Sequence, residues 1–470
     1  MKGITRRGFL KSTAFSGFGF ALGSALVSAA SFTKSRYAFA NPPMQIEPEP
    51  KINTGPVFER KSRLAGGKRS QPTAWYPVVQ GATSQTQTQF RILVDANRAY
   101  RYRVISSDGT KRDLSPRARF GVPTSQMVID HVYVDGLAAG ETYQLEIETG
   151  SRSERRWFST LNKKSDFGTP IRVALISCLN DRYEAEQGDM WSAVAESEPE
   201  LMIFNGDCCY VDQRSDGTIE GMWDRHLTTR TMLDVFKWDR LVPVLTTWDD
   251  HDTGENDSNS SNPRLGIAAK YFDAMFGSDP VDGYVKSQGR AAAFESHGMK
   301  FLLLDCRSNL SATQVYSITE EAWIEAQVKS AKGPVWLVNG TQFFGGYLIG
   351  AESVEATSAQ QLRRIMTSCA KADVPVGLMS GDVHFSELME LEPGILGYKS
   401  YEFTSSALHS RTFPGQQFRS FNERRFESTS KNNFLAIEMI ANSQKQISFE
   451  LASLGSGQQE FFRFRGQINR

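Results

Sequence analysis

The chain has 470 residues, with 53 basic and 53 acidic side chains and five cysteines. This length exceeds one small hydrophobic core and favours two or three domains. The balanced charge carries no nucleic-acid-binding signature. An odd and sparse set of cysteines excludes a disulfide scaffold and leaves at least one thiol unpaired.

Residues 1–40 are predicted to be a twin-arginine export signal that is cleaved. "TRRGFLK" at 5–11 contains Arg6 and Arg7, a weakly apolar stretch follows at 14–32, and "AFA" at 38–40 suits a signal peptidase. A transmembrane anchor is the alternative, but serines and glycines interrupt the stretch, which falls short of the roughly 20 apolar residues of a span. We therefore expect the twin-arginine translocase as a partner during export, a periplasmic or secreted location, and no stable membrane span.

The export signal holds six basic and no acidic residues, so the mature chain keeps 47 basic against 53 acidic side chains, a net charge of −6. Residues 41–70 are rich in Pro, Gly and charge without periodicity, which predicts an extended linker.

Residues 71–165 are predicted to form a small β-sandwich. Short alternating segments occur at 89–94, 100–106, 127–134, 142–149 and 155–160, with Gly, Asp and Asn turns between them. "VDGLAAGETYQLEIE" at 134–148 looks like part of a fibronectin-type module. We expect a fibronectin- or immunoglobulin-like domain here.

Residues 166–470 are predicted to form an α/β catalytic domain. Apolar runs such as "IRVALISC", "LMIFNGD" and "KFLLLDCRS" alternate with helical patterns near 189–196, 264–276, 319–331 and 358–372. Alternation of this kind indicates layered helices and sheets. Three β-like stretches end the chain.

Polar side chains follow six of these apolar runs. Individually each has an ordinary explanation: Cys178 as a core thiol, "GD" as a turn, "DDHD" as a helix cap. Together they indicate a metal site, because ligands gather at the carboxyl ends of α/β strands and buried carboxylates need a compensating cation. The residues, in chain order, are Cys178, Asp207, Asp249 to Asp252, Asp305 with Arg307, Asn339, and Asp382 with His384.

Six motifs in order resemble the alkaline phosphatase D (PhoD-like) family, related to purple acid phosphatases and metallophosphoesterases. They are "ISCLND", "NGDCCY", "TTWDDHDTGEND", "LLLDCRS", "MSGDVHFSE" and "YEFTSSALHS". The resemblance implies a four-layer αββα sandwich after the small β-domain, with iron (Fe³⁺) and calcium as cofactors. An oxygen-rich second site suits calcium, and other divalent metals are possible there.

The resemblance also implies roles for individual residues. Asp207 would bridge two metals, and Asp382 stands where related enzymes often have a histidine. Arg307 suits phosphate because a guanidinium matches phosphoryl oxygens; the alternative is a structural ion pair with Asp305. The metal ligands would be Cys178, Asp207, Tyr210, Asp250, Asp382 and His384; the catalytic residues His251 and Arg307; and the substrate-binding residues Asp249, Asn256 and His409.

Two departures from the family pattern leave alternatives open. Cys208 stands where an aromatic residue is usual, so Cys208 and Cys209 either pack in the core or form a vicinal disulfide. No separate histidine motif occurs near "WLVNGTQ", and Asn339 or Gln342 is a weak substitute.

The expected function is that of an exported metal-dependent phosphoesterase, hydrolysing small phosphate esters with metal-activated water. The alternative is a phosphodiesterase or phospholipase D-type activity on phospholipid or teichoic-acid-like polymers. A binding protein on an inactive scaffold is disfavoured, because none of the six motifs has lost its polar residues.

Overall fold

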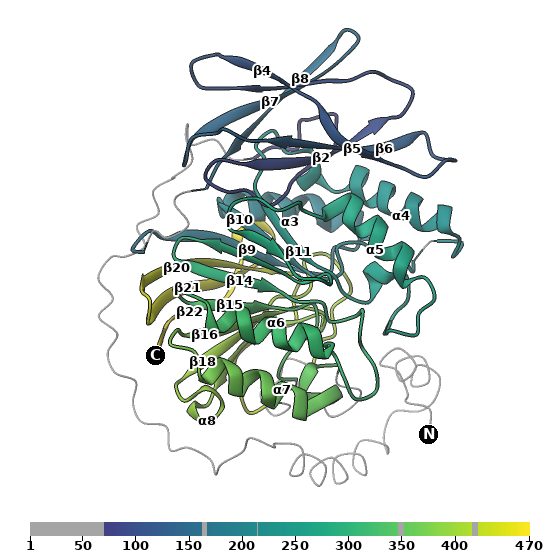
Figure 1. The fold of residues 1–470 in the computed structure, drawn as a ribbon. Helices are drawn as coiled ribbons and strands as arrows, with labels where there is room; N and C mark the ends of the chain where they lie inside the picture. The colour runs from purple at the N-terminus through teal and green to yellow at the C-terminus, as the bar shows by residue number, and fades with distance from the viewer. Residues whose placement is uncertain (1–69, 162–166, 214, 346–351, 416–421) are drawn as a thin grey trace.

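The computed structural model describes residues 70–161, 167–213, 215–345, 352–415 and 422–470 (Figure 1). The predicted export signal and nearly all of the predicted linker lie outside the described residues, as does the predicted boundary between the two domains. Within the described part, no helix has the length and apolar character that crossing a membrane requires.

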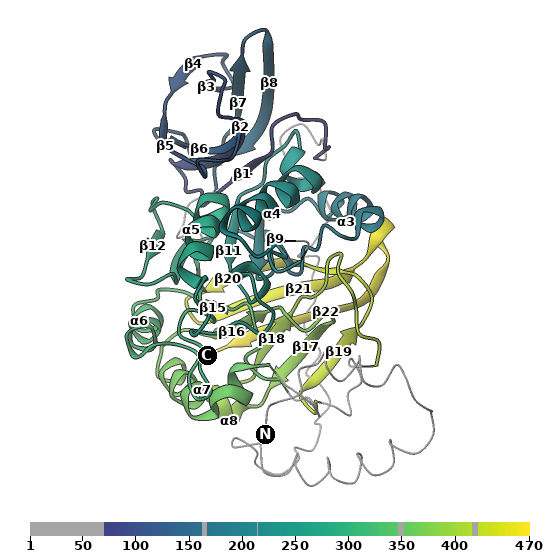
Figure 2. The same cartoon turned by 90° about the vertical axis from the view of Figure 1, so that its right-hand side faces the viewer.

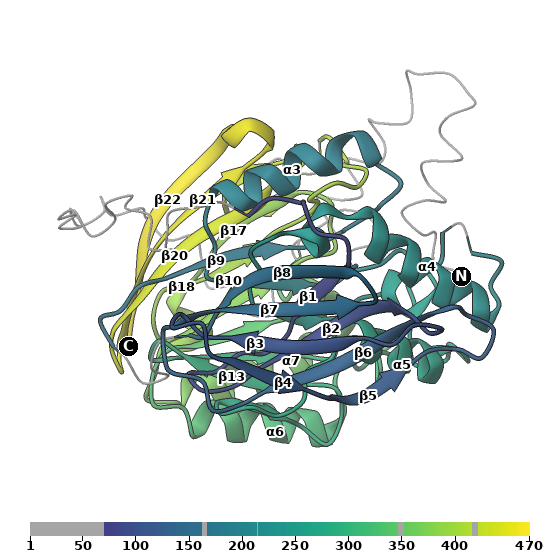
Figure 3. The same cartoon turned by 90° about the horizontal axis from the view of Figure 1, so that it is seen from above.

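The first described part of the chain forms two four-stranded antiparallel sheets stacked on each other (Figure 2). Their inner faces share one core, in which the rings of Phe90 and Phe158 lie 5.0 Å apart. One sheet has the order β1-β2-β6-β5 and the other β4-β3-β7-β8, and the second faces the viewer in Figure 3. The strands are β1 Val78–Gln80, β2 Thr88–Asp95, β3 Arg101–Ile105, β4 Lys111–Leu114, β5 Pro116–Phe120, β6 Met127–Val134, β7 Thr142–Thr149 and β8 Arg152–Ser159.

The five strands that the alternating segments predict are present, whereas β1, β4 and β5 were not predicted. β1 has three residues, and β4 and β5 read "KRDL" and "PRARF", with almost every side chain exposed. A strand of this kind pairs through its backbone and carries no alternation of apolar and polar residues.

The larger part of the chain contains a six-stranded and an eight-stranded sheet, with orders β11-β10-β9-β20-β21-β22 and β12-β13-β14-β15-β16-β18-β17-β19. The strands of the first are β9 Ile171–Ile176, β10 Leu201–Asn205, β11 Val244–Thr247, β20 Phe434–Ser443, β21 Gln446–Leu454 and β22 Glu460–Asn469. Those of the second are β12 Tyr284–Lys286, β13 Ala292–Ser296, β14 Met299–Leu303, β15 Val335–Val338, β16 Val376–Ser380, β17 Ser386–Leu391, β18 Ser400–Thr404 and β19 Arg425–Thr429.

Both faces of the central strands are buried, and neighbouring residues enter different cores. Val173 and Leu175 of β9 face the core between the sheets, while Ala174 and Ile176 face a helical layer. Successive side chains of a strand point to opposite faces, so one continuous apolar run serves two cores. The result is the predicted four-layer αββα sandwich.

Three helices cover the outer face of the six-stranded sheet and three cover the eight-stranded sheet (Figure 1). Side chains of Thr218, Ser317 and Ser353 cap α4, α6 and α7 by accepting backbone N–H bonds. The helices are α3 Glu184–Glu196, α4 Ile219–Met232, α5 Leu265–Phe276, α6 Ile318–Lys329, α7 Val354–Ala370 and α8 Pro393–Leu396. The 3₁₀ turns are η1 Asp234–Lys237, η2 His251–Thr253 and η4 Ser456–Gln458.

Helix α4 was not predicted because its buried face is largely polar. Arg225, His226, Thr229 and Arg230 are buried on it beside Met222 and Trp223. Helical periodicity is read from apolar residues, and this helix buries too few of them.

We expect His226 to make folding stability fall below neutral pH. Burial, with Arg230 and Arg225 nearby, lowers the pKa of His226 to about 3, against about 6.5 in an unfolded chain. The unfolded state therefore binds the extra proton first, so stability is present above pH 6.5 and is lost as the pH falls through 6.5 toward 3. Linkage gives a loss of about 2 kcal/mol between pH 7 and pH 5 from this group.

Urea unfolding at pH 7 and pH 5 measures this loss. His226→Gln removes the titrating ring. Its free energy of unfolding should therefore change between pH 7 and pH 5 by about 2 kcal/mol less than that of the wild type. An equal pH dependence in both proteins would contradict the buried neutral histidine.

Candidate metal centre

The candidate centre lies where the ends of parallel strands from both sheets meet. β9, β10 and β11 are parallel neighbours in one sheet, and β14, β15 and β16 in the other. Glycines allow the ends to touch: a Cβ on Gly206 would lie 2.7 Å from the Asp249 Cβ, and one on Gly340 2.6 Å from the Trp248 carbonyl oxygen. Only glycine fits such close approaches.

Four of the predicted metal ligands have left-handed backbone conformations. The φ angles are +60° at Cys178, +53° at Asp207, +72° at Asp382 and +59° at His384, among eight non-glycine residues with positive φ in the described chain. Such conformations are costly for residues with a Cβ and cluster at functional sites. The backbone turns sharply after three different strands and brings these side chains together.

A first donor group contains Cys178, Asp207 and His384, whose ligand atoms all lie within 4.8 Å of one another. The Cys178 Sγ is 3.6 Å from Asp207 Oδ2. The Tyr210 hydroxyl lies 3.2 Å from His384 Nε2 and so adjoins the group. Ser406 contacts two members of this group. Its Oγ is 3.0 Å from Cys178 Sγ and accepts the His384 backbone N–H at 2.8 Å.

A second donor group contains Asp207, Asp250 and His251. The His251 backbone N–H donates to Asp250 Oδ1 at 2.8 Å and to Asp207 Oδ1 at 3.3 Å. The His251 ring lies against the Tyr210 ring at 4.1 Å, and its Nδ1 is 2.8 Å from Asp212 Oδ1. Asp207 therefore belongs to both groups.

Two further groups are made of carboxylates alone and share Asp250. One contains Asp249, Asp250 and Asp382, and the other Asp250, Asp257 and Glu352. Asp252, the last residue of "DDHD", has a structural role instead, because its carboxylate accepts the backbone N–H groups of Cys209 and Asp249 at 2.8 and 3.0 Å. It holds together the two loops that carry the predicted ligands.

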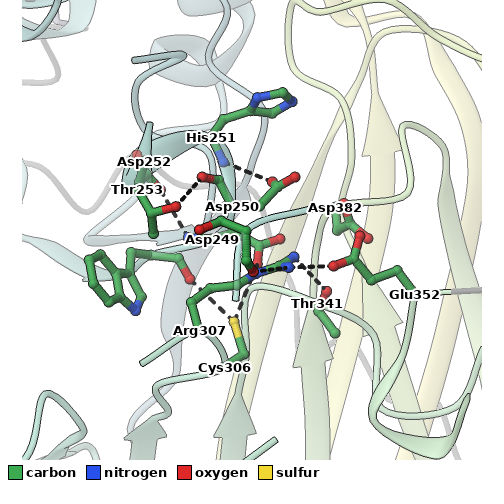
Figure 4. Close-up of polar contacts among 12 residues, drawn as sticks. Asp249, Asp250, His251, Asp252, Thr253, Cys306, Arg307, Thr341, Glu352 and Asp382 are labelled. Atoms are coloured by element: carbon green, nitrogen blue, oxygen red, sulfur yellow. Dashed lines mark hydrogen bonds and ion pairs between the residues drawn. The ribbon is translucent and has the colours of Figure 1, made fainter. Parts of the chain in front are cut away.

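Arg307 lies beneath the carboxylates and is fully buried (Figure 4). Its guanidinium pairs with Asp249 and Glu352 and donates to the Ser258 carbonyl at 3.2 Å and to Thr341 Oγ1 at 3.3 Å. Asp305 instead accepts the Arg307 backbone N–H and the Trp248 indole N–H. The guanidinium is thus paired with partners other than the Asp305 considered from sequence.

Without a cation, the groups crowd negative charge into a buried volume. Burial first, and neighbouring Asp250 and Cys178 next, raise the pKa of Asp207 well above its usual range; burial and Glu352 do the same for Asp382. Burial raises the pKa of Cys178 to about 12. Asp250 differs: although burial opposes ionisation, His251, Arg307 and backbone N–H donors lower its pKa.

These residues fit bound metal ions. Among the described residues, Asp249 Oδ2 is buried without a hydrogen-bond partner, and a positive charge would stabilise every carboxylate around it. The first group offers thiolate, imidazole and carboxylate, and the adjoining Tyr210 a phenolate, which together suit a transition metal. The third and fourth offer oxygen ligands alone, which suit a hard cation such as calcium.

The structure leaves two predicted substrate contacts outside these groups. Asn256 is half-buried in the turn after η2. His409 is fully buried, with Nδ1 3.1 Å from the Asn180 carbonyl oxygen and its ring 5.8 Å from that of Trp191. Their roles stay predictions.

Three residues that sequence reasoning missed lie in or beside the centre. Asp212 follows "GDCCY" by two positions, so extending that motif would have found it. Asp257 is the last residue of "TTWDDHDTGEND", so following that motif to its end would have found it. Glu352 stands outside every predicted strand end and every motif, and the sequence contains no signal for it.

The remaining open alternatives concern the cysteines and the missing histidine. Cys208 and Cys209 are both free and buried in the core beneath α4, so they pack and form no disulfide. Asn339 is buried at the end of β15, and Gln342 donates to Glu387 and Thr404 in a buried network.

Neither a family model nor a curated protein matches the chain. Among solved structures, that of PhoD has a TM-score of 0.65 at 15% sequence identity, covering 84% of this chain and 88% of PhoD. A purple acid phosphatase from yellow lupin (Lupinus luteus) seeds has a TM-score of 0.57 at 12% identity, covering 85% of this chain and 75% of that one. The predicted resemblance is confirmed at the level of the fold, which this chain shares with both proteins.

Proposed function

We propose that the chain is a metal-dependent phosphoesterase that hydrolyses phosphate esters with water. The observation that carries the proposal is the position of Asp207, which is a member of both the Cys178 group and the Asp250 group. A single carboxylate facing two donor sets is what a two-cation centre requires. The fold shared with PhoD and with a purple acid phosphatase supports the same function.

The donor chemistry divides the ligands between two cations. Cys178, Tyr210 and His384 would hold iron, Asp250 and Asp382 would hold calcium or another divalent ion, and Asp207 would serve both. When bound, such a pair supplies Lewis acidity to the phosphoryl oxygens and favours ionisation of water. Its site is formed by rigid strand ends, which limits reorganisation during the reaction.

His251 is the residue we assign to proton transfer. Its ring lies beside Asp207 and Asp250 but is left out of the cation ligands, and Asp212 lies within hydrogen-bond distance of its Nδ1. A carboxylate in this position fixes the orientation of the ring and its tautomer. His251 would then give a proton to the leaving oxygen of the ester.

Hydrolysis of p-nitrophenyl phosphate and bis-p-nitrophenyl phosphate, with and without EDTA, tests the proposal. A phosphomonoesterase hydrolyses the first faster, the alternative phosphodiesterase or phospholipase D-type enzyme prefers the second, and both lose activity with EDTA. Calcium should restore activity better than magnesium, because a site rich in carboxylate oxygens suits the larger ion, whereas magnesium demands near-ideal octahedral geometry. Metal-saturated protein that hydrolyses neither compound would contradict the proposal and favour a binding protein.

We expect Asp212→Asn to lower kcat by about 10- to 100-fold, the usual effect of removing a carboxylate that orients a histidine at a metal site. Its metal content should stay unchanged, because Asp212 belongs to none of the donor groups. Steady-state kinetics with elemental analysis measures both. Asp224→Asn, an exposed position on α4, is the matched control, and an equally small effect of both substitutions would refute the role of Asp212.

We propose export through the twin-arginine pathway, on the strength of "TRRGFLK". Replacing Arg6 and Arg7 together with Lys should leave active precursor in the cytoplasm, since only the export address changes. Cell fractionation with an activity assay measures this. Normal export of the double variant would refute the signal.

A further inference from the structure

The guanidinium of Arg307 is already committed to protein partners. Of the five N–H donors of an arginine, Nε pairs with Asp249, the two on Nη1 reach Glu352 and the Ser258 carbonyl, and one on Nη2 reaches Thr341. The side chain has no exposed surface. One N–H on Nη2 remains, but the buried side chain could present it to a phosphate only by shifting a paired charge out of its partners, which is costly.

The two carboxylates on Arg307 come from different donor groups. Asp249 belongs to the group with Asp250 and Asp382, and Glu352 to the group with Asp250 and Asp257. Figure 4 shows the guanidinium between them, with Asp382 beside Glu352. The guanidinium of Arg307 thus fixes the position of one carboxylate in each of the two carboxylate groups.

Glu352 reaches the centre because the start of α7 is anchored to the loop after β15. The backbone N–H of Val354 donates to the Gln342 carbonyl and that of Glu355 to the Phe343 carbonyl, at 2.8 and 3.0 Å. Ser353 caps the helix. The backbone places Glu352 at the edge of the centre, and Arg307 sets the direction of its side chain.

Resting on the proposed function, we propose that Arg307 is a positioning residue and not a phosphate contact. It is the internal cation that holds Asp249 and Glu352 in place, and Glu352 thereby becomes part of the oxygen-rich cation site. Without Arg307, Asp249 and Glu352 would repel each other and Asp250, and the site would lose its shape before any substrate binds.

The test separates cation binding from phosphate binding. Arg307→Gln removes an outer partner of the calcium site, and Glu352→Gln removes one of its oxygen ligands. In each variant, the calcium concentration that half-restores the metal content of chelated protein should rise by about tenfold or more. At saturating calcium, the inhibition constant of inorganic phosphate should stay within about twofold of the wild-type value. Elemental analysis after equilibrium dialysis gives the first quantity without reference to activity.

The controls address folding and coupling. Glu355→Gln changes a glutamate three residues further along, which pairs with Arg424 instead, and should leave calcium binding unchanged. Because Glu352 is partly exposed, Glu352→Gln keeps the test decisive if Arg307→Gln does not fold. The double variant should bind calcium no more weakly than Arg307→Gln alone, because the two residues act as a unit.

Unchanged calcium binding in Glu352→Gln would overturn the inference. So would an Arg307→Gln protein that keeps its metals while its phosphate inhibition constant rises by tenfold or more, about 1.4 kcal/mol of lost binding. Failure of the proposed function is a separate outcome, since it would appear in the wild-type protein as absence of phosphoesterase activity.

Discussion

Replacing Asp207 with asparagine is expected to lower turnover of an aryl phosphate at least about a thousandfold, as for loss of the groups that activate water. Asp207 is shared by two donor groups, with Oδ2 3.6 Å from Cys178 Sγ and Oδ1 3.3 Å from the His251 backbone nitrogen. An amide keeps the shape but loses the charge that would hold two cations close together. The variant should lose the second cation and bind iron more weakly.

Tyr210→Phe is the matched comparison for this result. It removes a hydroxyl beside the first donor group and leaves Asp207 intact, so iron should remain while its visible absorption decreases. Elemental analysis with kcat on p-nitrophenyl phosphate measures both variants. If Asp207→Asn kept two metals and near-normal turnover, "GDCCY" would be only a turn.

Cys178→Ser is expected to lower visible charge-transfer absorption and activity in parallel. Burial raises the pKa of this thiol to about 12, so it ionises only when a cation compensates the charge. Serine preserves the size of the side chain but is a poor ligand for iron. When iron is added to this variant, visible absorption and activity should therefore recover over the same range of iron concentration.

Cys208→Ser is the control for the thiolate. Its sulfur packs in the core, 3.9 Å from the Thr247 carbonyl oxygen, and belongs to none of the donor groups. Absorption and activity should both persist in this variant. Equal behaviour of the two serine variants would show that Cys178 is not a ligand.

The layered fold was predictable because its central strands are continuous apolar runs. The runs that became β9, β10 and β14 are continuous apolar segments, and the structure buries both of their faces. β4, β5 and α4 escaped prediction for the opposite reason, since their stability comes from backbone pairing or from buried polar side chains. The periodicity of apolar residues reveals neither backbone pairing nor buried polar side chains.

The candidate centre was predictable wherever a predicted ligand follows a strand directly. Cys178, Asp207, Asp250 and Asp382 do so, and parallel strands place their ends at one edge. Glu352 was not predictable, because it reaches the centre only through the anchoring of α7 to the loop after β15. Nor could the sequence show that Arg307 pairs with Asp249 and Glu352, because those contacts span 58 and 45 positions of the chain.

The central claim is that one carboxylate, Asp207, serves two cations in a phosphoesterase. The most direct measurement is the metal content per chain of the wild-type protein and of Asp207→Asn, determined together with p-nitrophenyl phosphate hydrolysis. We predict one iron and at least one further cation in the active wild type, and loss of the second cation and of activity in the variant. Full activity in a wild-type protein stripped of its metals would contradict the account.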